Sequence, residues 1–160
     1  MRQITPMLWF DDQAEQAVDF YGSVFDDVKV TEIARYGEAG PGEEGSVMTV
    51  AFELEGEPFV ALNGGPHFEF TEAISFVVGC ENQAEIDHFW EKLSEGGEEG
   101  QCGWLKDRFG LSWQIVPSRM GELMSDPDPE RARRTTEAML KMKKLDIAEL
   151  ERAREGEAVA

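Results

Sequence analysis

The sequence predicts an α+β protein made of two β-α-β-β-β units and a helical tail, and three observations support this. Several short segments alternate apolar and polar residues with a period of two, whereas two longer segments carry apolar residues at helical spacing. The two helical segments repeat one another, because Gln13-Ala14-Glu15 is echoed by Gln83-Ala84-Glu85 at an offset of 83 − 13 = 70 residues. Beyond Pro117 the pattern is helical throughout.

The first unit begins with a strand over residues 4–10, and Asp11 and Asp12 then start a helix over 13–25. Its remaining strands are predicted over 28–35, 46–54 and 57–63. A glycine-rich loop over 37–45 separates the first two of these strands, and Glu55-Gly56 joins the last two.

The second unit has a strand over 73–78, a helix over 83–93, a short strand over 99–102 and a closing hairpin. The hairpin is hinged at Asp107-Arg-Phe-Gly110, since a tight turn favours Asp at its first position and Gly at its fourth. Its second arm ends at Pro117, which has no N–H for the strand ladder. We expect Phe76, Phe89 and Trp113 to form the core between this sheet and its helix.

The tail carries three helix signals: a short helix over 121–125, Asp128 followed by Pro129, and a capping box of Asp146 with Glu149. Its apolar residues need burial, either on the chain's own surface or on a partner subunit. We therefore predict a domain over residues 1–118, built from modules at about 1–66 and 67–118, and a helical extension over 119–160.

The charge balance is strongly acidic, with 33 Asp and Glu residues against 15 Lys and Arg and a formal net charge of −18. Such a surface repels phosphate groups, so we expect neither nucleic acid nor a membrane as partner. No apolar run of 18 residues and no basic-then-apolar leader is present, which predicts a cytoplasmic protein. Cys80 and Cys102 show no metal-binding spacing and are expected to be free thiols.

Six segments together resemble one protein family: residues 4–10, 17–21, 60–66, 74–78, 103–110 and 143–147. The sequence is similar to the PhnB-like branch of the vicinal-oxygen-chelate (glyoxalase/bleomycin-resistance/dioxygenase) superfamily, a branch that often carries the label 3-demethylubiquinone-9 3-methyltransferase. The resemblance implies that the two βαβββ modules form an open, curled mixed sheet, a cup with its helices outside. It also implies a homodimer.

The superfamily's chemistry relies on a divalent metal held at four strand positions. The resemblance matches these positions to Thr5, Ala61, Ala73 and Gln114. Only Gln114 could ligate well, and a slip of one residue would add only Glu72, so we expect no metal site and no cofactor.

Alternation along the strands then predicts which side chains line the cup. If Thr5 faces inward, the inner surface also carries Ala61, Ala73, Val77, Ser112 and Val116. The predicted substrate-binding residues are Thr5, Met7, Trp9, Phe59, Asn63, Ser75 and Gln114. The alternative is that these side chains simply fill the cup as core. No catalytic residue is assigned, because no Ser-His-Asp, Cys-His or carboxylate pair points inward.

Two functions follow from the sequence. The first is a protein that binds a small molecule in the cup without the standard metal site. The second is an enzyme of the superfamily, an isomerase, dioxygenase or methyltransferase, with a non-standard site. The sequence Gly40-Pro-Gly-Glu-Glu-Gly45 matches a nucleotide-binding pattern, but a strand follows it where a helix is required, so we interpret it as a loop.

Overall fold

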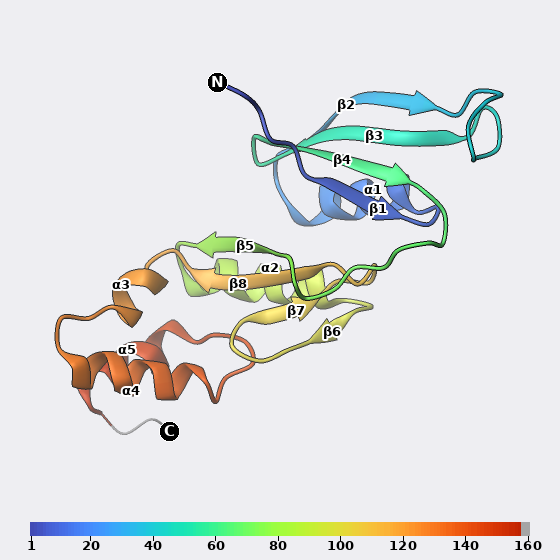
Figure 1. Ribbon diagram of the computed structural model, residues 1–160. Coiled ribbons are helices and arrows are strands. Elements are labelled where there is room, and N and C mark those ends of the chain that lie inside the picture. The colour runs from blue at the N-terminus through green and yellow to red at the C-terminus, as the bar shows by residue number, and fades with distance from the viewer. Residues whose placement is uncertain (158–160) are drawn as a thin grey trace. The chain divides into compact units, whose positions relative to one another are not determined.

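A computed structural model, which describes residues 1–157, divides the chain into two compact units with the boundary between Phe70 and Thr71 (Figure 1). Within the described residues, no helix is long and apolar enough to cross a membrane.

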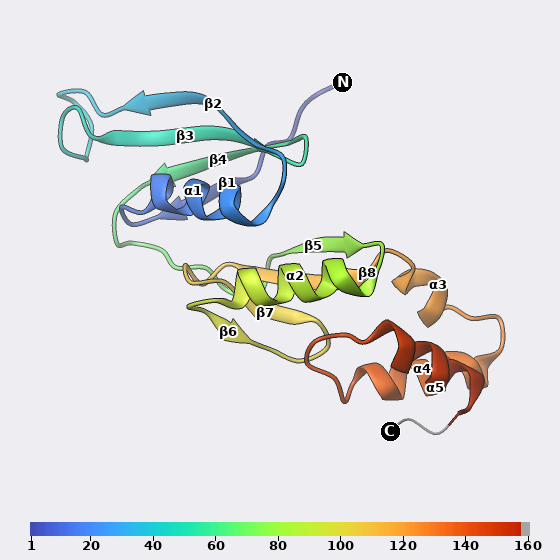
Figure 2. The same cartoon turned by 180° about the vertical axis from the view of Figure 1, so that it is seen from behind.

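The first unit is a four-stranded mixed sheet with one helix against one of its faces (Figures 1 and 2). Its elements are β1 (Met7–Phe10), α1 (Ala14–Val24), β2 (Val28–Arg35), β3 (Val47–Leu54) and β4 (Glu57–Asn63). The strand order is β1-β4-β3-β2, with β1 parallel to β4 and the other pairs antiparallel. The parallel pair requires a crossover, and α1 provides part of it.

The second unit repeats this topology. Its elements are β5 (Ser75–Cys80), α2 (Gln83–Ser94), β6 (Glu98–Glu99), β7 (Trp104–Lys106) and β8 (Ser112–Pro117). The order is β5-β8-β7-β6, with β5 parallel to β8, and α2 contacts the sheet through β5, β7 and β8. The predicted α+β class, with two βαβββ modules and C-terminal helices, is confirmed; the strands form two four-stranded sheets, and neither closes into a barrel.

Burial identifies the covered face of each sheet. In the first unit, Leu8 and Phe10 of β1 are buried together with Val50 and Phe52 of β3. In the second unit, Trp113 is only 2% exposed, and its ring centroid lies 5.7 Å from that of Phe76, as the sequence predicted. Phe89 was expected in the same core but is only partly buried.

The hairpin turn forms where the sequence predicted it. The backbone N–H of Gly110 donates to the carbonyl of Asp107 at 2.9 Å, which closes the turn. The Asp107 side chain is buried and accepts hydrogen bonds from the backbone N–H groups of Phe109 and Leu111 at 2.9 and 3.1 Å. The carboxylate therefore organises the whole turn.

The tail forms α3 (Met120–Met124), α4 (Pro129–Met139) and α5 (Ile147–Glu155). The predicted caps are present, because Asp128 and Asp146 accept from the N–H groups of Glu130 and Glu149. The apolar side chains of the tail form a core cluster inside the second unit: Leu123, Met142, Leu145 and Leu150, with Val116, Met120, Ala138 and Met139 packed against them. The tail thus buries its apolar face on its own chain.

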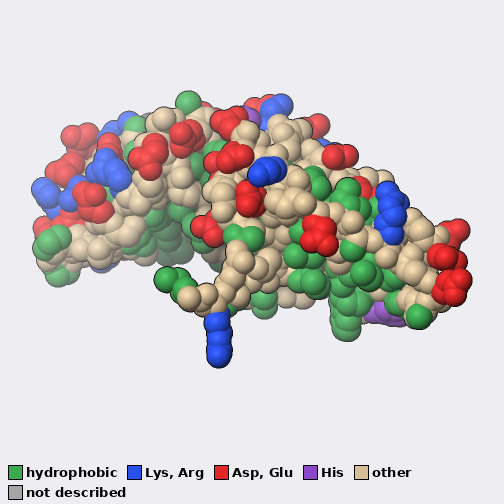
Figure 3. Space-filling view, turned by 90° about the horizontal axis from the view of Figure 1, so that it is seen from above, with side chains coloured by type: hydrophobic (Ala, Val, Ile, Leu, Met, Phe, Trp, Pro, Cys, Tyr) green, Lys and Arg blue, Asp and Glu red, His purple; other side chains and the backbone are tan. Residues whose placement is uncertain are grey.

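Charged side chains are spread over the surface, and acidic groups are scattered across the face drawn in Figure 3. The basic residues of the tail pair mostly with acids of the tail itself, for example Arg154 with Asp126 and Arg119 with Glu151. Lys144 is different, since its ammonium group pairs with Asp87 on α2. This contact links the tail to the helix of the second unit.

Candidate functional site

Each sheet has one face opposite its crossover helix, α1 or α2, which we call the open face. In the first unit, the register pairs Met7 with Val60 and Trp9 with Leu62, so these four side chains share the open face. Met7 is 58% exposed, and the other three are partly buried. The predicted positions of Met7 and Trp9 on one surface are therefore confirmed, whereas Thr5 precedes β1 and is exposed.

The indole of Trp9 is held in place by the loop that follows β4. Its Nε1 donates to the carbonyl of Gly65 at 2.8 Å, and its ring packs edge-on against Phe68 with centroids 4.8 Å apart. A Cβ atom on Gly64 would lie 2.3 Å from the Trp9 ring, so only glycine fits there. Gly64 and Gly65 thus hold the Trp9 side chain in place.

The prediction that Phe59, Ala61 and Asn63 face the same way as Met7 and Trp9 is wrong. The register pairs Leu8 with Ala61 and Phe10 with Asn63, which places the odd-numbered residues of β4 on the helix-covered face. Phe59 is 9% exposed and stacks on Phe52 with centroids 5.6 Å apart. Val60 and Leu62, which were not predicted as site residues, occupy the open-face positions.

Asn63 has a structural role in this arrangement. Its Oδ1 accepts from the N–H of Ala14 at 2.8 Å, at the first turn of α1, where Gln13 provides no side-chain cap. Its Nδ2 donates to Glu15 at 2.9 Å and to the carbonyl of Val47 at 3.0 Å. The amide therefore caps a helix from a neighbouring strand, and all three contacts are internal.

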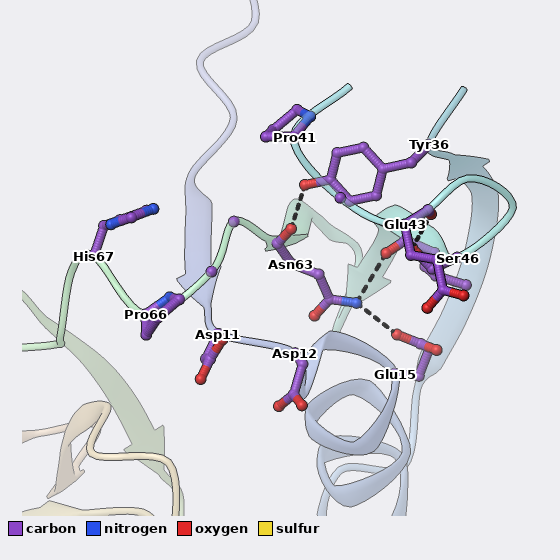
Figure 4. A pocket seen from close by; sticks show the side chains of 14 residues that line it. Asp11, Asp12, Glu15, Tyr36, Pro41, Glu43, Ser46, Asn63, Pro66 and His67 are labelled. Carbon is purple, nitrogen blue, oxygen red and sulfur yellow. Dashed lines mark hydrogen bonds between the residues drawn. The ribbon is translucent and has the colours of Figure 1, made fainter. Parts of the chain in front are cut away.

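A hollow of about 450 Å³ lies beyond the carboxyl ends of β1 and β4 (Figure 4). Tyr36 forms one wall, and its hydroxyl donates to the backbone carbonyl of Asn63. Cβ atoms on Gly40 and Gly42 would lie 2.7 and 2.3 Å from the Tyr36 ring. The loop with the nucleotide-binding pattern is therefore folded around a tyrosine, and that packing explains Gly40 and Gly42. Side chains around the hollow include Asp11, Asp12, Glu15, Glu43 and His67.

In the second unit the structure brings two predicted site residues together. Gln114 Nε2 donates to the Oγ of Ser75 at 2.9 Å, between adjacent strands β8 and β5. The register pairs Gln114 with Val77 on one side and with Trp104 on the other, so these side chains share the open face. Val77 is 59% exposed. This face combines apolar surface with a polar pair.

Ser112 lies on the same face, two residues before Gln114 on β8. Its register partners are Ser75 on β5 and Lys106 on β7. The Ser112 side chain is 1% exposed, and its Oγ is the buried side-chain atom of the described residues that lacks a hydrogen-bond partner. Lys106 forms an ion pair with Glu72, which lies just before β5. Lys106 was not predicted as a site residue, because only the register of β7 and β8 places it beside Ser112.

Charges on this face influence each other. The hydrogen bond and charge of Lys106 lower the pKa of the Glu72 carboxyl, and Glu72 in turn raises the pKa of Lys106. Both groups are exposed enough for water to screen the pair. On the covered side of the sheet, burial raises the pKa of the Cys80 thiol to about 12, with smaller effects from Glu85 and Glu81.

The internal repeat allows the metal positions to be matched again in the structure. At the offset of 70 residues, Met7 corresponds to Val77 and Thr5 corresponds to Ser75. Met7 pairs with Val60 and Val77 pairs with Gln114, so Val60 corresponds to Gln114. The matches to Ala61 and Ala73 that were made from the sequence therefore move to Val60 and Ser75. Two hydroxyls, one amide and a valine do not fit a divalent cation, which needs three or four stronger donors. Among residues 1–157 there is also no group of three or more His, Cys, Asp and Glu that could hold a metal.

Comparison with known proteins gives a consistent result. The family described as 3-demethylubiquinone-9 3-methyltransferase matches residues 2–116. The PhnB protein from Bacillus cereus is 38% identical, with a TM-score of 0.65 over 72% of this chain and 99% of that chain. Protein PA1353 from Pseudomonas aeruginosa is 18% identical, with a TM-score of 0.60 over 73% and 98%.

The fosfomycin resistance protein FosX from Listeria monocytogenes, complexed with Mn(II) and a sulfate ion, is 14% identical, with a TM-score of 0.52 over 77% of this chain and 94% of that chain. At this identity the likeness concerns the fold alone. A search of curated proteins found no match.

Proposed function

Since the chain belongs to the 3-demethylubiquinone-9 3-methyltransferase family, the PhnB-like family of the glyoxalase superfamily, we propose that it binds a small molecule. The binding surfaces are the open faces of its sheets, and the contacts are made by side chains without the standard metal. In the first unit the contact residues are Met7 and Trp9. In the second unit they are Ser75 and Gln114.

One observation carries this proposal. Met7 and Val77 occupy equivalent positions of the two repeats and are 58% and 59% exposed, on the sheet faces opposite α1 and α2. Side chains that served only the core would be buried at these two positions, and side chains that only faced solvent would be polar. A ligand with an apolar part gives these side chains a partner.

The family label suggests methyl transfer, but specific observations weigh against it here. The glycine-rich loop over 37–45 packs on Tyr36, and the element that follows it is strand β3. A nucleotide-binding loop needs free backbone N–H groups at the start of a helix. We therefore favour binding over either enzyme alternative, the methyltransferase or the metal-dependent type.

The neutral dye N-phenyl-1-naphthylamine tests the proposal, because its fluorescence rises in apolar sites and it carries no charge to be repelled. We expect saturable binding that Met7→Asp or Val77→Asp weakens. Ile33→Asp is the matched control, since Ile33 is 50% exposed on β2 and is paired with Val50, on the helix side of its sheet. Equal binding by all three variants would contradict the proposal.

The homodimer and the cytoplasmic location also remain proposals. The tail face offered as a dimer surface is buried within the second unit, so support for a dimer now comes from the open edges of the two sheets. Sedimentation of the full chain at micromolar concentration and high salt distinguishes a dimer from an 18.0 kDa monomer. Fractionation of cells that express the chain tests the location.

A further inference from the structure

We propose that the open face of the second unit binds the carboxylate of an organic acid, with Lys106, Ser112 and Ser75 as its donors. This inference rests on the proposed function and names the class of ligand for that face. It begins with Ser112, whose buried hydroxyl lacks a hydrogen-bond partner among the described residues. A buried unsatisfied polar group is unfavourable, and its persistence points to a partner that binds there.

The neighbours of Ser112 are donors. Ser75 on β5 and Lys106 on β7 are its register partners on either side, so all three side chains lie on the same face. Ser75 Oγ accepts from Gln114 Nε2, which leaves the hydroxyl hydrogen of Ser75 free to point at another acceptor. Gln114 is thus a positioning residue, whereas Ser75, Ser112 and Lys106 can each donate to one bound group.

The acceptor now on this face is the carboxylate of Glu72. Strand β8 lies between β5 and β7, so the ion pair from Lys106 to Glu72 links the segment just before β5 to the strand on the other side of β8, and Lys106 is the register partner of Ser112. The two side chains of this pair are 36% and 58% exposed, and exposed ion pairs of this kind are weak. Glu72 therefore stands in for a ligand carboxylate, and a competing carboxylate can displace it at little cost.

The side chains next to the three donors indicate which chemical group is attached to the ligand's carboxylate. Trp104 and Val77 flank Gln114 in register, next to the donor row, and Val77 is 59% exposed. An aromatic or branched apolar body attached to the carboxylate would contact these two side chains. The chain's net charge of −18 opposes any anion at long range, but at an ionic strength of about 0.15 M this repulsion is screened beyond about 8 Å.

Benzoate and its neutral isostere benzamide provide the test, titrated by NMR against the full isotope-labelled chain at constant ionic strength. Benzoate should bind more tightly than benzamide. Lys106→Met should weaken benzoate binding about tenfold, as expected for loss of a charge-assisted hydrogen bond, and leave benzamide binding unchanged. Ser112→Ala should weaken benzoate binding without lowering the melting temperature, because it removes an unsatisfied hydroxyl.

The decisive variant is Glu72→Gln, which removes the internal competitor and should tighten benzoate binding severalfold. Glu91→Gln on α2 is the control, since it changes the net charge equally at an exposed site away from this face. Damage to the fold would not increase affinity. The inference is overturned if Glu72→Gln binds benzoate no more tightly than the parent chain, or if benzoate and benzamide bind alike or not at all. Dye binding that persists in that case would leave the proposed function standing.

Discussion

Asp107 and Trp113 are joined across the hairpin of the second unit: the indole Nε1 of Trp113 donates to Oδ2 of Asp107 at 3.0 Å. Both side chains are 2% exposed. Because Oδ1 of the same side chain also accepts from Phe109 and Leu111, one buried carboxyl group accepts hydrogen bonds from three donors. The turn, the strand and the core aromatic residue therefore depend on a single side chain.

Asp107→Ala should lower the free energy of unfolding by about 3–5 kcal/mol, because it leaves buried donors without an acceptor. Urea denaturation followed by tryptophan fluorescence measures this. Trp113→Phe is the matched control, since it removes one donor and keeps the ring in the core. A loss no larger for Asp107→Ala than for the control would show that the carboxylate does not organise the turn.

Gly64→Ala should destabilise the first unit by about 1–3 kcal/mol, because the new methyl group would overlap the Trp9 ring. The tryptophan emission spectrum of the protein should change as the Trp9 indole moves away from Gly64. Gly37→Ala is the control, since a Cβ atom there meets nothing within 4 Å, and its effect should stay within about 0.5 kcal/mol. Equal melting temperatures for the two variants would refute the steric argument.

Gln83→Ala should loosen the tail. The Gln83 side chain donates to the carbonyl of Leu145 at 3.0 Å and accepts from the N–H of Ile147 at 2.9 Å, which we expect to contribute about 1–3 kcal/mol. Hydrogen exchange at residues 145–147 should accelerate. Gln13→Ala, at the equivalent exposed position of the first repeat, should leave exchange and stability unchanged. Unaltered exchange in Gln83→Ala would mean that the apolar cluster alone holds the tail.

Cys80 should resist alkylation in the native protein at pH 8. Burial raises its pKa to about 12, so the thiolate is rare, and the side chain is 1% exposed. Because the pKa of this thiol is higher in the folded protein than in the unfolded chain, the free energy of unfolding should fall as the pH rises from the unfolded thiol's pKa towards 12. Mass spectrometry after brief iodoacetamide treatment should find Cys102, which is only partly buried, labelled first. Prior labelling of Cys80 would contradict this burial.

Removal of divalent metals should leave the fold unchanged. The donor set of Thr5, Val60, Ser75 and Gln114 does not fit such an ion, so no linked binding free energy is lost. Melting temperature and metal content are compared before and after chelation, with dialysis in high monovalent salt to strip cations that collect on surface carboxylates. A stoichiometric metal that survives dialysis, and whose loss in Gln114→Ala lowers stability, would reverse this conclusion.

Most of the fold could be predicted because its signals are local. The repeat of Gln13-Ala14-Glu15 at Gln83, the turn at Asp107 and the caps at Asp128 and Asp146 each depend on a few adjacent residues. Alternation also placed Trp113 in the core and Ser112 with Gln114 on the opposite face, because polar and apolar residues alternate there.

The orientation of β4 could not be predicted in this way. Residues 58–62 are Pro-Phe-Val-Ala-Leu, all apolar, so the sequence contains no alternation that identifies a face. Only the pairing of Met7 with Val60 decides it, and a shift of one residue reverses every side chain. Ser75 and Ser112 were predicted on the inner surface, but their alignment with Lys106 was not, for a similar reason: the row spans three strands, and their register is a property of the sheet.

The cap that Asn63 provides for α1 also sets an order of events during protein synthesis. The donor and acceptor of that hydrogen bond are separated by 49 residues, whereas α2 carries its own cap, Asn82, at its first turn. A short helix without its cap is marginal in water. On the ribosome, the cap of the first helix can therefore be completed only after the end of β4 has emerged, whereas the cap of its later copy emerges directly before that helix.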